Sequence, residues 1–193
     1  FNYLSGFSKQ KTYQKLLVSP TSLRKKFIFL INREIENAKK GKKSEIIAKM
    51  NSLVDPEIIQ LLYLASQMGV KISLIIRGIC CLYPQRKNLS ENITVISVIG
   101  HFLEHSRIFW FYNNNDSEVF IGSADWMRRN LDRRIEAVTP IEDLELKSQL
   151  YNLLQTYLHD NYYSWVMNKD GTYEKKKENS NSNRSQFDLI EKL

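Results

Sequence analysis

Apolar residues recur along the chain in two patterns, one typical of helices and one typical of buried strands. Spacings of three and four residues, which place side chains on one helical face, predict helices over residues 22–40 and 55–69. Nearly continuous apolar runs are typical of strands that are buried on both faces of a sheet. Such runs predict three strands, at Ile46–Met50, Val70–Ile76 and Ile93–Val98.

Residues at the ends of the two helices support this interpretation. Ser22 is a candidate N-cap for the first helix, and Asp55-Pro56-Glu57 gives the second a cap, a first-turn proline and an early acid. Gly41 and Gly69 follow the last apolar positions, where glycine commonly ends a helix.

The second half of the chain is predicted to contain a hairpin and a further helix. Arg107–Tyr112 and Glu118–Ile121 are separated by an Asn-rich segment that suits a turn. A last helix is predicted from Pro140 to about His159, and Leu16–Val18 is predicted to be a short strand. Strands that alternate with helices indicate an α/β layered fold in a single domain.

The composition changes from about Asn168, after which apolar residues are sparse. This change predicts a domain over residues 1–167 and a polar, flexible tail over 168–193, with Gln186–Leu193 as a candidate terminal helix. The chain begins at Phe1 without a methionine, and we interpret it as a fragment of a longer protein.

The charge of the chain indicates an anionic partner without choosing one. It has 28 Lys and Arg against 21 Asp and Glu, a net charge of +7, which suits a nucleotide, polyphosphate, nucleic acid or a membrane surface. The adjacent Cys80 and Cys81 fit neither a disulfide nor a zinc site, and we expect them to be reduced core thiols of a cytosolic protein. We find no signal peptide and no apolar run long enough to span a membrane.

Basic side chains occur where the predicted strands begin and end. His105 and Arg107 are two residues apart, so in a strand they would face the same side and could meet one anion. Arg77 follows a buried strand, where ligands gather in open α/β sheets, and a guanidinium can bind phosphate with two parallel hydrogen bonds. Lys49 and Asn51, also two apart, could present donors on one face.

Several segments in the same order resemble bacterial polyphosphate kinase. The resemblance covers about residues 1–165 and is carried by Ile47–Asp55, Leu62–Ser66, Ile76–Cys80, Leu89–Ile93 and Phe102–Glu136. It implies the C-terminal domain of that family, whose fold is phospholipase-D-like: a mixed sheet flanked by helices. The chain departs from the family at His101, where an arginine is usual, and in the loop after Pro84, which lacks the usual glycines.

The resemblance also implies a reaction. Enzymes of this family move the γ-phosphoryl group of ATP through a phosphohistidine to the end of inorganic polyphosphate, and the reaction is reversible. The phosphohistidine lies in the preceding domain, so this fragment alone is expected to be inactive. The implied partners are ATP or ADP, polyphosphate, the remaining domains and further copies of the full-length chain, with Mg²⁺ on the nucleotide and no nucleic acid. The implied location is the cytoplasm, including the periphery of the inner membrane.

The resemblance places the second histidine of the reaction at His105, as a phosphate ligand and a general acid to the leaving phosphate. It assigns phosphate or nucleotide binding to Arg77 and Arg134, with Arg107, Lys49 and Asn51 as further candidates and with no protein ligand for a metal. Gly122-Ser123 is a further candidate, because backbone N–H groups in a turn can face an anion.

The residues alone leave structural alternatives open for each of these positions. His105 could pack at the start of a strand and bond to a carbonyl group, Arg77 could be a surface arginine, and Lys49, Asn51 and Arg107 could be structural. Arg134 could form a salt bridge with Glu136 or Asp132.

Two other functions also remain open. One is a phospholipase-D-like nuclease or phosphodiesterase half-domain, although that motif has lysine two residues after the histidine, where this chain has Arg107. The other is a non-catalytic basic module that binds polyanions. It would need surface aromatic residues, whereas Phe109–Phe111 are expected in the core.

Overall fold

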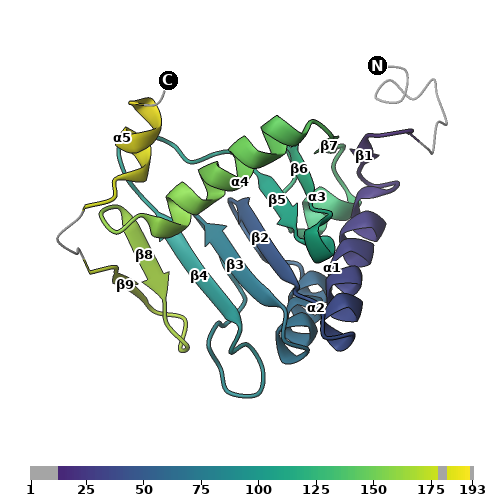
Figure 1. The fold of residues 1–193 in the computed structure, drawn as a ribbon, viewed down its shortest axis with the longest axis horizontal. Coiled ribbons are helices and arrows are strands. Elements are labelled where there is room, and N and C mark those ends of the chain that lie inside the picture. The colour runs from purple at the N-terminus through teal and green to yellow at the C-terminus, as the bar shows by residue number, and fades with distance from the viewer. Residues whose placement is uncertain (1–12, 178–181, 192–193) are drawn as a thin grey trace.

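Nine strands of the described residues form a mixed sheet in the order β1-β7-β6-β5-β2-β3-β4-β8-β9 (Figure 1). The structure is a computed structural model that describes residues 13–177 and 182–191. The strands are β1 (Leu17–Val18), β2 (Glu45–Met50), β3 (Lys71–Ile76), β4 (Ile93–Val98), β5 (Ile108–Phe111), β6 (Glu118–Gly122), β7 (Ala137–Ile141), β8 (Ser164–Met167) and β9 (Tyr173–Lys175). The helices are α1 (Leu23–Lys39), α2 (Pro56–Gln67), α3 (Arg128–Asp132), α4 (Leu144–His159) and α5 (Ser185–Ile190).

Helices cover both faces of this sheet. Alternate residues of β2 explain the arrangement: Ile46 and Ala48 pack with the apolar faces of α1 and α2, whereas Ile47 packs with Leu154 and Tyr157 of α4. Figure 1 shows α4 lying across the face of the sheet that is opposite α1 and α2. The predicted α/β fold with a mixed sheet between helices is confirmed.

The helix signals read from the sequence lie where the helices begin and end. Asp55 caps α2, because its Oδ1 accepts a hydrogen bond of 3.1 Å from the amide of Ile58. Gly41 and Gly69 follow α1 and α2 with φ of +68° and +92°, a conformation that glycine adopts without strain. Ser22 occupies the N-cap position of α1, but its hydroxyl binds Val18 and caps no helix amide.

The predicted hairpin is formed by β5 and β6. Its turn contains Asn113, Asn114 and Asn115 at φ of +46°, +52° and +75°, a left-handed region that asparagine tolerates better than most residues. The aromatic residues Phe109–Phe111 are buried, as predicted, with exposed fractions of 0–5%.

The chain after the hairpin differs from the prediction. Pro140 does not begin a helix but lies in β7, and α4 begins at Leu144 behind its cap Asp143. The short elements α3, β8 and β9 were not predicted. Within the segment expected to be a polar tail, β9 pairs with β8, and α5 covers most of the candidate terminal helix. Residues 192 and 193 of that helix lie outside the described residues.

Two further observations bear on the sequence interpretation. Cys80 is half-buried, but Cys81 is exposed, so the expectation of two core thiols was wrong for Cys81. Throughout the described ranges, no helix has both the length and the apolar character needed to cross a bilayer.

Candidate functional site

Four loop segments meet at one edge of the sheet. Strands β2, β3 and β4 are parallel, and β5 runs antiparallel to both β2 and β6, so β2, β3 and β6 end at the edge where β5 begins. Beyond that edge Leu53 forms parallel bridges with both Cys80 and Trp126, which holds the loops after β2, β3 and β6 side by side. Residues distant in sequence are therefore brought together.

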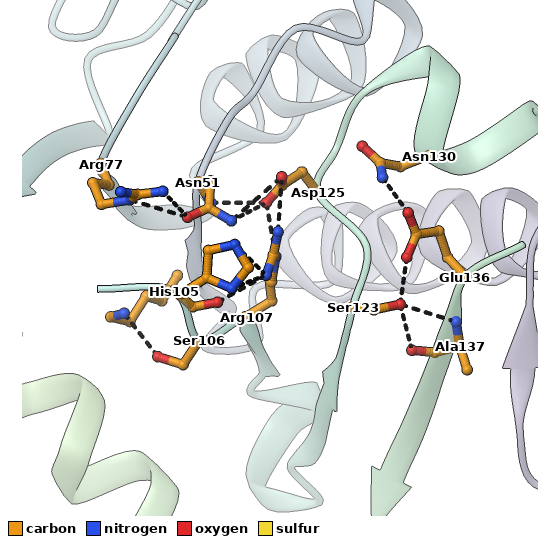
Figure 2. A network of polar contacts seen from close by, with 11 residues as sticks. Asn51, Arg77, His105, Ser106, Arg107, Ser123, Asp125, Asn130, Glu136 and Ala137 are labelled. Carbon is orange, nitrogen blue, oxygen red and sulfur yellow. Dashed lines mark hydrogen bonds and ion pairs between the residues drawn. The ribbon is translucent and has the colours of Figure 1, made fainter. Parts of the chain in front are cut away.

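Asn51 and Asp125 form the centre of a polar network at this edge (Figure 2). The backbone amide of Asn51 donates to Asp125 Oδ1 at 2.8 Å, and its side-chain Nδ2 donates to the same oxygen at 3.3 Å. Asn51 Oδ1 accepts hydrogen bonds from Nε and Nη2 of Arg77, at 3.1 and 2.9 Å. The buried amide of Asn51 therefore links Arg77 to a carboxylate and orients its guanidinium.

Arg107 joins the same carboxylate to His105. Its Nε and Nη2 donate to the two oxygens of Asp125 at 3.1 and 3.3 Å, and its Nη1 donates to the His105 carbonyl at 2.8 Å. The same Nη1 lies 2.9 Å from His105 Nδ1. The same Nη1 also lies 3.4 Å from His105 Nε2, so the guanidinium that is fixed by Asp125 contacts the ring at both nitrogens.

Lys49 anchors the segment that carries His105. Its ammonium lies 3.0 Å from Glu104 Oε2, donates to Ser106 Oγ at 2.8 Å, and sits over the ring of Tyr157. Lys49 is 2% exposed, and burial lowers the pKa of its ammonium although Glu104 opposes that shift. Lys49 of β2 thus holds Glu104 and Ser106, while His105 between them is exposed to solvent.

The structure brings together five of the six predicted site residues: Asn51, Arg77, His105 and Arg107 in one network, with Lys49 on the neighbouring residues of the same segment. Arg134 is not joined to them by any contact between described residues. Its side chain is exposed and forms no salt bridge with the described acids, since Asp132 binds Arg24 and Glu136 binds Ser123 and Asn130.

The expectation for Gly122-Ser123 was wrong. The amide of Gly122 donates to the carbonyl of Arg107 and that of Ser123 to the carbonyl of Ala137, so neither N–H is free for an anion. A Cβ on Gly122 would lie 2.4 Å from the Ala137 carbonyl oxygen, so this glycine is required by the close approach of β6 and β7.

The acidic residues at the site do not fit a metal centre of their own. Both oxygens of Asp125 accept hydrogen bonds from Arg107, and those of Glu104 are bound by Lys49 and Gln186. No group of three or more His, Cys, Asp or Glu within residues 13–177 and 182–191 could hold a metal ion.

Sequence reasoning missed Asp125, Glu104 and Gln186. Asp125 had a usable signal, since it is an acid in a loop beyond a strand end, in a stretch rich in arginine. Glu104 is adjacent to His105 in sequence. Gln186 lies more than 80 residues away from its partners, and no local pattern predicts its contact.

Comparison with known proteins gives consistent results. The sequence model described as Polyphosphate kinase C-terminal domain 2 matches residues 16–186. The polyphosphate kinase of Prochlorococcus marinus (strain MIT 9313) is 61% identical over 192 residues, which are 98% of this chain and 27% of that protein. The crystal structure of polyphosphate kinase from Porphyromonas gingivalis superposes with a TM-score of 0.95 at 39% identity, covering 100% of this chain and 30% of that one.

A more distant similarity concerns the fold alone. Nuc from Salmonella typhimurium, a phospholipase D family member, superposes with a TM-score of 0.51 at 18% identity over 73% of this chain and 90% of its own. The fold is therefore phospholipase-D-like, as expected. The chain spans about a quarter of the length of the curated relative from Prochlorococcus.

Proposed function

This chain belongs to the polyphosphate kinase family as its C-terminal domain 2, and we propose that it supplies half of a phosphoryl-transfer site. In the full-length enzyme the γ-phosphoryl group of ATP moves to a histidine of the preceding domain and then to the end of polyphosphate, reversibly. This domain holds the travelling group against that histidine. ATP or ADP, polyphosphate and the other domains of the polypeptide are the partners in this proposal.

One observation carries the proposal: an unbroken series of contacts from Arg77 through Asn51, Asp125 and Arg107 to His105. A permanent positive charge and an exposed imidazole are fixed at the same edge of the sheet. Phosphoryl transfer depends mainly on placing the reactants and neutralising charge, and this arrangement supplies both.

The contacts suggest a different role for each residue. Arg77 donates from Nε and Nη2 to Asn51, and its Nη1, which has no hydrogen bond to the described residues, can donate to a phosphate oxygen. His105 presents an exposed imidazole, which in its protonated form can donate to a phosphate oxygen and act as a general acid. Arg107 donates from Nε, Nη1 and Nη2 to Asp125 and His105, so its role is to orient the imidazole of His105. Asn51 and Lys49 position Arg77 and the His105 segment. Arg134 stays a candidate nucleotide ligand from the family resemblance.

Magnesium enters this proposal only on the phosphates of the nucleotide. The carboxylates of this domain are already bound by cationic and amide groups. We therefore expect Mg²⁺ to neutralise nucleotide charge without a ligand from this chain.

Kinetics of the full-length enzyme test the proposal. We expect His105→Ala and Arg77→Ala each to lower polyphosphate synthesis by about tenfold or more, because general acid catalysis and a charged phosphate contact are lost. Arg77→Lys keeps the charge but loses the planar fork, so it should recover only part of the rate. His159→Ala, which removes an exposed histidine of α4, is the matched control and should synthesise polyphosphate at the wild-type rate. Near-normal synthesis in both alanine variants would refute the proposal.

The chain on its own should make no polyphosphate, because the histidine that accepts the phosphoryl group is not among its residues in this proposal. Synthesis by the purified chain, followed as ATP-dependent formation of long polyphosphate, would contradict that division of labour.

A further inference from the structure

The short helix α5 contacts the segment that carries His105. Gln186, in its first turn, is 4% exposed and directs its whole amide toward that segment. Gln186 Nε2 donates to the Phe102 carbonyl at 2.9 Å, and Gln186 Oε1 accepts from the Phe102 amide at 3.0 Å. The side chain thus pairs with one residue as a neighbouring strand would.

The same amide nitrogen reaches the acid next to His105. Gln186 Nε2 donates to Glu104 Oε1 at 2.8 Å, and the other oxygen of Glu104 is bound by Lys49. The Gln186 amide nitrogen therefore donates to both Phe102 and Glu104, while its oxygen accepts from the Phe102 amide. Replacing this amide would leave Glu104 Oε1 and the backbone groups of Phe102 without these hydrogen bonds, which costs folding free energy.

A buried acid fixes α5 in this position. Asp160, which is fully buried at the end of α4, accepts from the amide of Ser185 at 2.8 Å and from its hydroxyl at 2.5 Å. Its other oxygen accepts from the amides of Tyr162, Tyr163 and Ser164, at 2.7–3.0 Å. The residue that precedes Gln186 is therefore attached to the body of the domain.

The fit between α5 and the segment leaves little space. A Cβ on Gly100 would lie 2.4 Å from Gln186 Oε1 and 3.0 Å from the ring of Tyr163. The ring of His101 packs edge-on against both Tyr163 and Phe187, at centroid distances of 5.9 and 5.7 Å. The C-terminal helix and residues 100–104 thus form one packed unit beside the site.

We infer that Gln186 is a positioning residue for the phosphoryl-transfer site, which holds Glu104 toward Lys49 and thereby fixes the imidazole of His105. The inference rests on the proposed role of His105. Among the described residues, three groups face Glu104: Lys49 from β2, the hydroxyl of Tyr157 from α4, and the Gln186 amide from α5. A change at Gln186 leaves both the charge of Lys49 and the ring of Tyr157 in place.

The experiment uses the full-length polyphosphate kinase with Gln186→Ala, Gln186→Glu and the control Gln149→Ala, which alters an exposed glutamine of α4. We expect Gln186→Ala to lower kcat by about tenfold or more, with KM for ATP changed by less than about threefold, because the reacting group is misplaced. Hydrogen exchange of residues 101–107 should become faster. The control should match the wild type in all three measurements.

The glutamate variant adds a readout that a purely structural role would not alter. It places a second carboxylate beside Glu104, and like charges at this distance favour the uptake of a shared proton. Its relative activity should therefore rise as the pH is lowered from 8 toward about 6, compared with the wild-type profile. A profile that follows the wild type at every pH would count against the inference.

Unchanged exchange of residues 101–107 in Gln186→Ala, or faster exchange with normal kcat, would overturn the inference. Normal synthesis by His105→Ala alongside a slow Gln186→Ala would instead refute the proposed role of His105, which separates the two failures. Should Gln186→Ala fail to fold, Gln186→Asn keeps the amide on a side chain one methylene shorter and gives the same measurements.

Discussion

The ammonium of Lys49 lies 3.0 Å from the carboxylate of Glu104, and both side chains are buried. Lys49 belongs to β2 at the centre of the sheet, and Glu104 precedes the exposed His105. A buried ion pair thus connects the core of the domain to the residue that we propose meets the phosphoryl group.

Removing the lysine of this pair should destabilise the domain. Lys49→Met leaves the Glu104 carboxylate buried without a cation, and we expect the free energy of unfolding to fall by about 3–5 kcal/mol. Urea unfolding followed by tryptophan fluorescence measures the change. Lys39→Met, which breaks an exposed pair with Glu36, is the control and should cost less than about 1 kcal/mol. Adding Glu104→Gln to Lys49→Met should restore part of the loss, and failure to do so would contradict the account.

Asp125 should matter for catalysis although it is not expected to touch the substrate. Asp125→Asn keeps the shape of the side chain but removes the charge that fixes Arg107, so the ring of His105 loses its orientation. We expect kcat of the full-length enzyme to fall by about tenfold or more. Asp116→Asn, in the exposed hairpin turn, should leave kcat unchanged. Equal rates in the two variants would show that the Asp125 contact has no part in the reaction.

The sequence predicted most of the fold because the central elements carry strong local patterns. The strands β2 and β3 are nearly continuous apolar runs, and Asp55-Pro56 opens α2 with a cap and a first-turn proline. The failures occur where a local rule competes with tertiary pairing. Pro140 resembles a helix start, but it lies in β7 opposite Phe120, and the acid that starts α4 is Asp143. The strand β9, with the sequence Tyr-Glu-Lys, is three exposed residues long and has no pattern to detect.

Acid should weaken the domain partly through Asp55. Burial raises the pKa of its carboxyl group. Hydrogen bonds from Arg24 and from the Ile58 amide together lower that pKa by more, so the net pKa lies below the usual value. Because the folded pKa is depressed, the stabilisation is complete above the unfolded value of about 3.9 and is lost as the pH falls through the folded value.

The variant Asp55→Asn tests this dependence. It removes a charged helix cap and one arm of the Arg24 pair, so we expect a loss of about 3 kcal/mol at neutral pH. Its stability should then change less than that of the wild type between about pH 4 and pH 2. Parallel pH curves from thermal unfolding of the two proteins would contradict this explanation.

The two cysteines should differ in reactivity. Burial raises the pKa of the Cys80 thiol to about 11, whereas Cys81 is exposed. A chromogenic disulfide reagent at pH 8 should therefore modify Cys81 faster than Cys80 by about tenfold or more, since the thiolate is the reactive form. Cys81→Ser should remove the fast phase and Cys80→Ser should retain it. A fast phase that survives in Cys81→Ser would show that Cys80 is accessible as a thiolate.

The sequence predicted the cationic members of the site and Asn51, but it did not predict the acids Asp125 and Glu104 or the amide of Gln186. His105, Arg77 and Arg107 carry recognisable chemistry at strand ends, so spacing and family resemblance were enough to select them. Asp125 and Gln186 act through contacts that depend on how distant loops fold together. Arg134 was selected by resemblance alone, and its exposed side chain has no partner among the described residues that would fix its place.

In the proposed function, Arg77 and His105 bind the same travelling phosphoryl group. A crystal structure of the full-length polyphosphate kinase with Mg²⁺ and a non-hydrolysable ATP analogue tests it most directly. Oxygens of the terminal phosphate should accept hydrogen bonds from Arg77 Nη1 and from the imidazole of His105. A terminal phosphate bound elsewhere, with both side chains still turned to their present partners, would contradict it.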